Sequence, residues 1–115
     1  MNQSEAVIAS SGSQSGAIDL QHFLLCGVIM PASWTTADLT FLGSADDFGD
    51  PEGTWSPIYD QYGNEFTVTA AASQVIQIDP AGFAGVRHVK VRSGTSGTPV
   101  NQAAERTLTL VLRAG

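Results

Sequence analysis

The sequence predicts an all-β protein, a single-domain antiparallel β-sandwich of jelly-roll type, and three observations support this prediction. Apolar and polar residues alternate over short segments, as expected for strands with one buried face. Glycine, proline, asparagine and aspartate separate these segments, which is typical of turns. No long segment repeats its apolar residues with the period of a helix. A chain of 115 residues and 12.0 kDa is large enough for one hydrophobic core.

The first half of the chain is expected to hold an arm, two strands and a loop. Residues 1–16 are rich in serine and glycine, so they predict an extended N-terminal arm, flexible or docked on a partner, ahead of a sandwich domain of residues 17–115. The apolar run 17–30 predicts a strand that ends at a proline. Residues 39–42 predict a shorter strand, and the acidic loop 45–53 follows it.

The second half of the chain is expected to begin with a turn and to continue with strands. The turn is predicted at 60–64, where Gly63 and Asn64 tolerate a positive φ. Alternating residues then predict strands at 65–69, 74–78, 86–92 and 106–113. The inward-facing side chains of the last two strands are expected to be Val89, Val91, Leu108, Leu110 and Leu112.

Charge is distributed unevenly along the chain, whose formal net charge is −6. All five basic residues lie in the last 29 positions: Arg87, Lys90, Arg92, Arg106 and Arg113. Ten of the eleven acidic residues lie at or before Asp79, so only Glu105 accompanies the bases. Either late strands pair with early strands inside one fold, or the acidic face of one copy meets the basic face of another. We do not expect so acidic a chain to bind nucleic acid.

Two charged clusters are candidate interface sites. The basic cluster, on the strand 86–92, consists of Arg87, Lys90 and Arg92. The acidic cluster, on the loop 45–53, consists of Asp46, Asp47, Asp50 and Glu52. We expect both to form salt bridges with neighbouring subunits. Carboxylates on a loop could instead hold Ca²⁺, but their spacing differs from the EF-hand pattern, so we predict no metal site.

No motif in the sequence indicates an enzyme. His22 and His88 are far apart in the chain, and the single cysteine, Cys26, lies in an apolar run where we expect it to be buried. The spacing therefore matches no zinc site, and the chain cannot form an internal disulfide. Ser93 with either histidine stays open as a nucleophile and base, but no catalytic motif surrounds it. We expect no catalytic activity and no cofactor.

Four aromatic residues allow two interpretations. Trp34, Trp55, Tyr59 and Tyr62 could offer flat faces for a sugar ring, with Tyr62 and Trp55 as the candidate sugar contacts. Alternatively, the two tryptophans close the ends of the sandwich and donate their indole N–H groups to backbone acceptors. We favour the second interpretation for the tryptophans, because a small sandwich needs large side chains at its open ends.

Three segments resemble part of the discoidin-like domains, which have a galactose-binding-like jelly roll. Residues 41–47 and 53–58 are similar to the strand, acidic loop and tryptophan of that family, and residues 86–92 are similar to its return strand. The resemblance covers residues 39–92 and implies the jelly-roll fold. This chain differs by an insertion at 48–52, which puts sugar binding in doubt.

A second resemblance is to small proteins encoded in the structural-gene regions of tailed phages. It rests on residues 31–34, 40–41, 53–55, 59–60, 63, 91–95 and 100–103. It implies a virion structural protein, and we expect a head decoration or cement protein that binds the major capsid protein or other virion subunits. We expect a homo-oligomer, with a trimer favoured by capsid symmetry. The alternatives are a carbohydrate-binding module of a tail fibre or tip, and a structural protein of the neck, tail or baseplate.

The expected location follows from the same resemblance and from the hydropathy of the chain. The first residues lack the positive charge of a signal peptide, and no apolar stretch reaches 18 residues. We therefore expect a protein that is made in the host cytoplasm, does not enter a membrane and is placed in the virion, on the capsid surface.

Overall fold

The computed structural model describes residues 2–44 and 55–114. Within these residues the chain forms eight strands and one short 3₁₀ helix. The elements are β1 (Asn2–Ile8), β2 (Ile18–Asp19), β3 (Phe23–Ile29), β4 (Leu39–Ser44), β5 (Ser56–Pro57), β6 (Val75–Gln77), η1 (Pro80–Phe83), β7 (His88–Ser93) and β8 (Arg106–Ala114). The all-β prediction is therefore confirmed.

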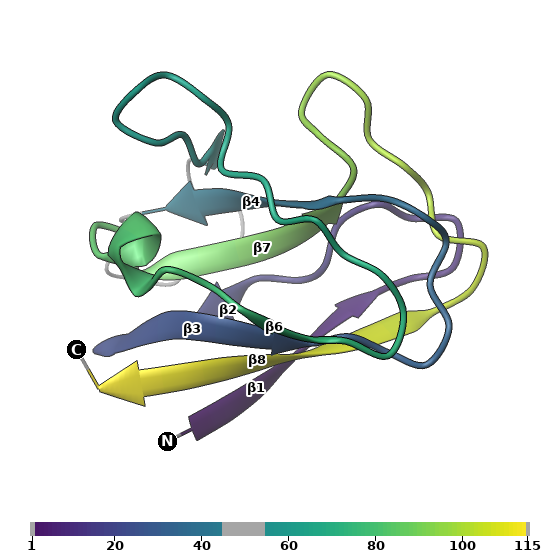
Figure 1. Ribbon diagram of the computed structural model, residues 1–115, viewed down its shortest axis with the longest axis horizontal. Coiled ribbons are helices and arrows are strands. Elements are labelled where there is room, and N and C mark those ends of the chain that lie inside the picture. The colour runs from purple at the N-terminus through teal and green to yellow at the C-terminus, as the bar shows by residue number, and fades with distance from the viewer. Residues whose placement is uncertain (1, 45–54, 115) are drawn as a thin grey trace.

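The strands form two antiparallel sheets of four strands that pack face to face (Figure 1). Sheet A has the order β1-β8-β3-β6, and sheet B has the order β2-β7-β4-β5. The first strand pairs with the last, and the pairing continues inward in the same way: β1 with β8, β2 with β7, β3 with β6, and β4 with β5. Early acidic strands thus lie beside late basic strands within one chain, the first of the two arrangements that the charge distribution allows.

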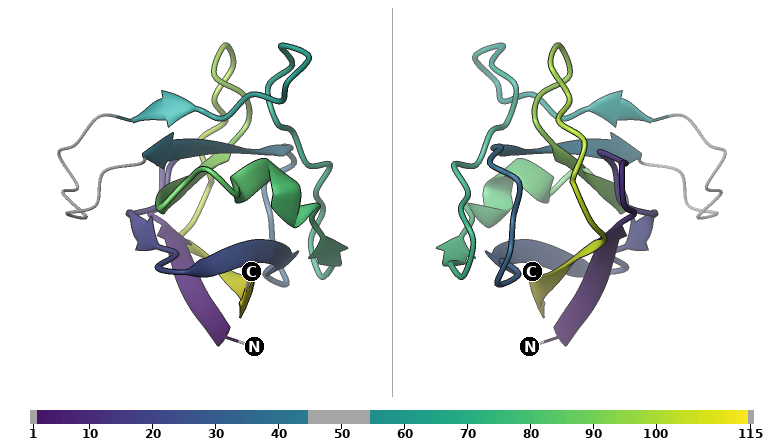
Figure 2. Two further views of the ribbon diagram at one scale, coloured as in Figure 1. Left: turned by 90° about the vertical axis from the view of Figure 1, so that its left-hand side faces the viewer. Right: turned by 90° about the vertical axis from the view of Figure 1, so that its right-hand side faces the viewer.

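The core lies between the sheets and is built by alternating residues. Leu108, Leu110 and Leu112 of β8 are buried, and so are Val89 and Val91 of β7, as their alternation predicts. Figure 2 shows the two layers from either end of the sandwich. β8 buries one face and leaves the other partly exposed, whereas the outer face of β7 is also largely covered.

The 3₁₀ helix η1 closes one end of the sandwich. Its Phe83 is fully buried, and its ring meets those of Phe41 and Phe66 edge-on, with centroids 5.1 and 5.2 Å apart. The side chain of Asp79 caps the helix by accepting a hydrogen bond from the Ala81 N–H. This helix was not predicted from the sequence, because it is too short to show a helical period.

The structure corrects the prediction of an N-terminal arm. Residues 2–8 are β1, which pairs with β8 from Asn2 opposite Leu112 to Ile8 opposite Arg106. Residues 9–16 then run beside sheet B. The Ser15 N–H donates to the Val91 carbonyl over 2.8 Å, and the Ser15 hydroxyl accepts a hydrogen bond from the Val91 N–H. Backbone and hydroxyl hydrogen bonds hold this serine-rich segment, so the sandwich includes it and does not begin at residue 17.

Three other predictions also change. The run 17–30 is two strands, because a turn at Gln21, whose φ is 56°, carries the chain from sheet B to sheet A. Residues 65–69 contribute isolated bridges to their neighbours, and no named strand lies there among the described residues. In the turn 60–64, Gly63 has a positive φ of 85°, while Asn64 does not.

Candidate functional site

The outer face of sheet B carries the predicted basic cluster, and Arg92 is buried within it. Only 5% of this residue is exposed. Its Nε donates to the Thr40 hydroxyl over 3.0 Å, and its terminal nitrogen forms a hydrogen-bonded salt bridge with Glu65. The sequence predicted that this guanidinium faces outward toward another subunit. It is instead covered and paired within its own chain, because a buried guanidinium needs a carboxylate partner.

Glu65 joins three parts of the chain on this face. Besides its salt bridge to Arg92 on β7, its carboxylate accepts hydrogen bonds from the N–H and the hydroxyl of Ser96, at 3.1 and 3.2 Å. Ser96 lies in the loop that follows β7. Glu65 therefore fixes that loop over the end of sheet B, a role that its place at the start of an alternating segment did not reveal.

Arg87 also has an acidic partner within the chain. Its Nε lies 3.0 Å from Oδ1 of Asp19 on β2, and both side chains are partly exposed. The hydrogen bond from Arg87 lowers the pKa of the Asp19 carboxyl below its ordinary value of 3.8; desolvation opposes this effect, and the Gln21 N–H adds to it. This pair joins strands 68 residues apart in sequence.

His88 lies behind this pair and is almost fully buried, with 3% exposed. Its Nε2 is 3.7 Å from the Asp19 carboxylate, beyond hydrogen-bonding distance. Among the described residues, neither ring nitrogen has a hydrogen-bond partner. The Ser93 hydroxyl donates to the Val100 carbonyl and accepts from the Gln102 amide, so it makes no hydrogen bond with His88. Ser93 and His88, one of the two pairs that the sequence left open, are thus not assembled as nucleophile and base.

The aromatic candidates do not share one site. The Nζ of Lys90 lies 4.6 Å from the ring centroid of Trp55, so a cation covers one face of that indole. Tyr62 is 80% exposed on a turn where the Asp60 carboxylate accepts from the Tyr62 and Asn64 N–H groups. Trp34 donates its indole N–H to the Ala37 carbonyl over 3.0 Å and packs against the core, as its structural interpretation predicts.

The acidic members of the predicted interface are not part of the described structure. Asp46, Asp47, Asp50 and Glu52 all lie outside the described residues.

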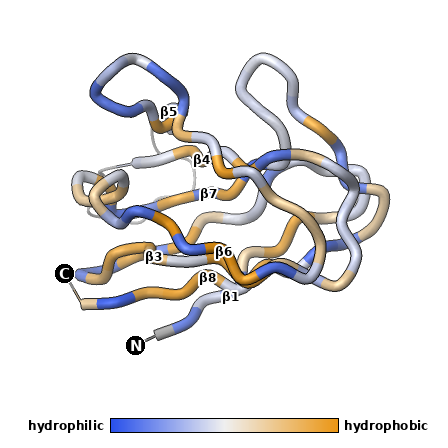
Figure 3. Tube along the Cα trace, in the orientation of Figure 1, coloured by the Kyte–Doolittle hydropathy of each residue, from blue (hydrophilic) through white to orange (hydrophobic). Residues whose placement is uncertain are grey.

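The outer face of sheet A is hollowed and partly apolar. Two cross-sheet rows point outward, Gln3–Val111–Gly27–Gln77 and Glu5–Thr109–Ile29–Val75. A hollow of about 610 Å³ is lined by the first row and by Ile29 and Val75 of the second. Val75 is 66% exposed and Val7 is 41% exposed. Figure 3 shows the hydrophobic character of β3, β6 and β8, and no described segment lies below this sheet in that view. This face was not predicted from the sequence, in which these valines and isoleucines had no functional role.

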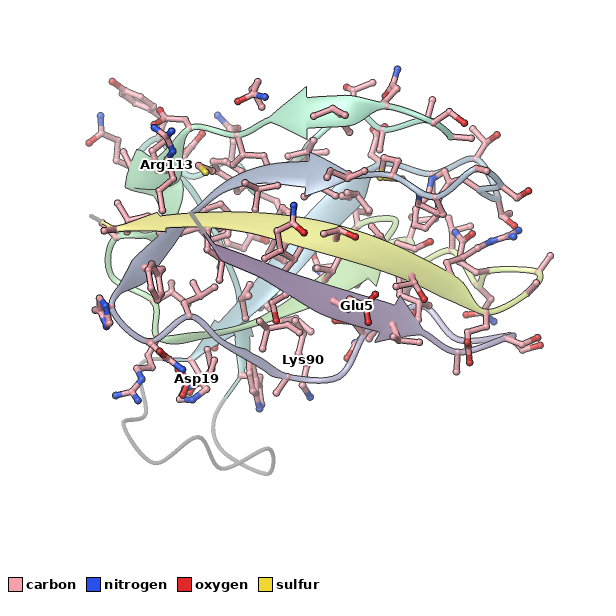
Figure 4. All side chains as sticks on the ribbon, turned by 90° about the horizontal axis from the view of Figure 1, so that it is seen from below. Glu5, Asp19, Lys90 and Arg113 are labelled. Carbon is pink, nitrogen blue, oxygen red and sulfur yellow. The ribbon has the colours of Figure 1, made fainter. Side chains whose placement is uncertain are left out.

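Glu5 and Arg113 are the exposed charges of this face. Figure 4 looks onto it and shows Glu5 on β1 and Arg113 near the end of β8. Among the described residues, neither side chain has an ion-pair or hydrogen-bond partner. The other four basic residues all have partners within the chain. Arg87, Lys90 and Arg92 contact Asp19, the Trp55 ring and Glu65, and Arg106 donates to Gln102 and Thr35. Arg113 is thus available to a partner outside the chain.

The described residues hold no candidate set of metal ligands. No group of three or more histidine, cysteine, aspartate or glutamate side chains gathers there as a set of metal ligands. In the same part of the chain, no helix has the length and hydropathy needed to cross a membrane. Comparisons with protein-family models, curated proteins and solved structures found no match to this sequence.

Proposed function

We propose that this chain is a non-enzymatic virion structural protein of a tailed phage, specifically a head decoration or cement protein. The observation that carries this proposal is the outer face of sheet A, which exposes Val75 and Val7 on its two edge strands and has a hollow lined in part by Ile29, Val75 and Val111. Exposed apolar side chains beside a hollow on a small protein are typical of protein–protein contact. The phage assignment itself rests on the resemblance of short segments to small virion-region proteins.

The proposed fold type fits this role. Pairing of β1 with β8, β2 with β7, β3 with β6 and β4 with β5 is the order expected when a long antiparallel hairpin wraps into two sheets, as in a jelly roll. Jelly rolls occur in viral capsid proteins, but also in lectins and cupins, so the fold alone does not decide the function.

The contacts of the basic side chains favour an assembly role over the binding of an anionic ligand. Arg87, Lys90, Arg92 and Arg106 are each engaged by other groups of the same chain. These contacts stabilise the sandwich and leave little of the basic cluster for a nucleic acid or an acidic ligand. An assembly role needs only complementary surfaces, and sheet A offers one.

The proposal is tested with capsids of the phage or prophage whose structural genes flank this gene. Capsids that lack the protein are mixed with purified protein, pelleted and melted in a scanning calorimeter. We expect saturable rebinding and a higher capsid melting temperature, because a ligand at a hundred times its Kd stabilises the bound state by about 3 kcal/mol. Capsids that neither bind the protein nor shift their transition would refute the decoration role.

The carbohydrate-binding alternative has less support. A sugar site needs aromatic faces grouped in one concave place, whereas Trp55 is covered on one side by Lys90 and Tyr62 stands on an exposed turn. A glycan array provides the check. Saturable binding that is lost in Tyr62→Ala would favour this alternative over the assembly role.

A further inference from the structure

We propose that the outer face of sheet A binds the same face of a second copy of this chain about a two-fold axis, with Glu5 of each copy paired with Arg113 of the other. This inference goes beyond the virion role and does not depend on it. It rests on three properties of the face: its apolar centre, its charges and its size.

The centre of the face is built to receive apolar side chains. Ile29, Val75 and Val111 project from three neighbouring strands, and Gly27 in the middle has no side chain, which leaves the hollow of about 610 Å³. A Cβ at Gly27 would lie 3.6 Å from that of Val111, on this outer side of the sheet. Water in such a hollow is displaced favourably by apolar side chains, and the same face of another copy offers valine and isoleucine for this purpose.

The charges make the face complementary to itself. It carries one acid, Glu5, and one base, Arg113, which lie apart on the sheet and have no partner among the described residues (Figure 4). A two-fold axis in the plane of the face, perpendicular to the line between these residues, places each one over the other. Both salt bridges of the pair are then identical, as an isologous contact requires.

This geometry favours a two-fold dimer over a cyclic trimer. In a trimer each copy uses two different surfaces, whereas the sheet A face is complementary to itself. The trimer expected from capsid symmetry would therefore have to form through another part of the chain.

The size of the face sets the expected affinity. The strands of sheet A have seven, nine, seven and three residues, and at a spacing of about 4.8 Å they cover on the order of 400 Å² in each copy. The pair would bury about 800 Å² in total, the size of a weak or transient contact. We therefore expect a reversible dimer with a Kd in the high micromolar range.

A charge-reversal experiment tests the pairing. Sedimentation velocity of the full chain at low salt is expected to show a concentration-dependent monomer–dimer equilibrium. Glu5→Arg and Arg113→Glu, each alone, should raise the dimer Kd at least tenfold, because each places two like-charged pairs in the interface. An equimolar mixture of the two variants should restore dimers, since every cross-chain pair then joins opposite charges. Asp38→Arg, an exposed acid beside sheet B, is the matched control and should leave the dimer unchanged.

A second readout does not depend on charge variants. Cys26 is a free cysteine that lines the hollow, and it is only partly buried in the single chain. Its reaction with a thiol reagent should slow several-fold as the protein concentration rises through the Kd. Val75→Lys should abolish both this protection and the dimer, while circular dichroism confirms that the variant is folded.

Three results would overturn the inference. The first is a wild-type protein that stays monomeric up to millimolar concentration, the second is a trimer, and the third is a mixture of the two charge variants that does not dimerise. The capsid experiment is separate from these. A dimer that leaves capsids unaffected supports the pairing and refutes the decoration role, and capsid binding by a strict monomer does the reverse.

Discussion

The outer faces of the two sheets differ in how their charged side chains are partnered. On sheet B, Arg92 meets Glu65, Arg87 meets Asp19 and Lys90 covers an indole ring, all within one chain. On sheet A, Glu5 and Arg113 have no partner among the described residues, and Val111 lies between them beside Gln3 and Thr109. Strands with similar alternation can thus have a covered outer face or an exposed one, depending on which segments pack over that face.

Loops account for the difference. Residues 11–15 run beside β7, with the Ser93 N–H donating to the Ser13 carbonyl, and Glu65 ties the loop around Ser96 to the same sheet. Sheet A has no such cover in Figure 1, where its strands form the lower surface of the molecule. The outer face of sheet B is therefore covered within the monomer, while the outer face of sheet A leaves apolar side chains that a partner can cover.

The largest expected effect comes from breaking the buried pair on sheet B. Glu65→Ala should lower the free energy of unfolding by about 3 to 5 kcal/mol, because it leaves a buried guanidinium without its counter-charge. Urea denaturation measures the loss. The matched change on the open face, Arg113→Ala, should cost less than about 0.5 kcal/mol in the monomer. Equal losses at the two positions would remove the distinction between the faces.

Replacing His88 is expected to change the free energy of unfolding less, and to raise it. Both of its ring nitrogens are buried without a hydrogen bond. His88→Leu removes these unsatisfied groups and keeps an apolar side chain of similar size, so the free energy of unfolding should rise by about 1 kcal/mol. Thermal melting at pH 7 is the measurement. A clear loss of stability would mean that the imidazole contributes an interaction that sheet B needs.

The smallest effect is expected at the exposed pair on sheet B. Asp19→Asn should cost about 0.2 to 1 kcal/mol at neutral pH, as is usual for a solvent-exposed ion pair. Because the pKa of Asp19 is lowered by Arg87, its contribution is present above the ordinary value of 3.8 and is lost as pH falls through the lower folded pKa. Urea titrations should therefore show wild type and variant converging as pH falls below the lowered pKa of Asp19. A stability difference that persists in acid would contradict this account.

Local patterns predicted much of the fold. Strict alternation identified the buried faces of β7 and β8, and a glycine next to an asparagine marked the turn at Gly63. The identity of the partners was out of reach, because Arg92 and Glu65 are 27 residues apart and Arg87 and Asp19 are 68 apart. Such contacts depend on sheet register, which a single sequence does not specify.

Composition misled the prediction where the backbone, rather than the side chains, makes the contacts. The serine-rich segment before β2 has the composition of a flexible linker, yet Ser15 pairs with Val91 through main-chain and hydroxyl groups. The apolar outer face of sheet A was missed for a related reason. Ile29 and Val75 look like core residues in a sequence, and only the pairing of β3 with β6 places them outside.

The order of strand pairing has a consequence for how this protein acquires its structure. Among the described strands, β1, β2, β3 and β4 do not pair with one another, so the first part of the chain to leave the ribosome has no partner strand until the later part follows. The innermost pair, β4 with β5, can close early, but β1 must wait for β8, the last strand to be made. Folding should thus be slow and concerted after synthesis, and fragments from the first half should form no sheet of their own.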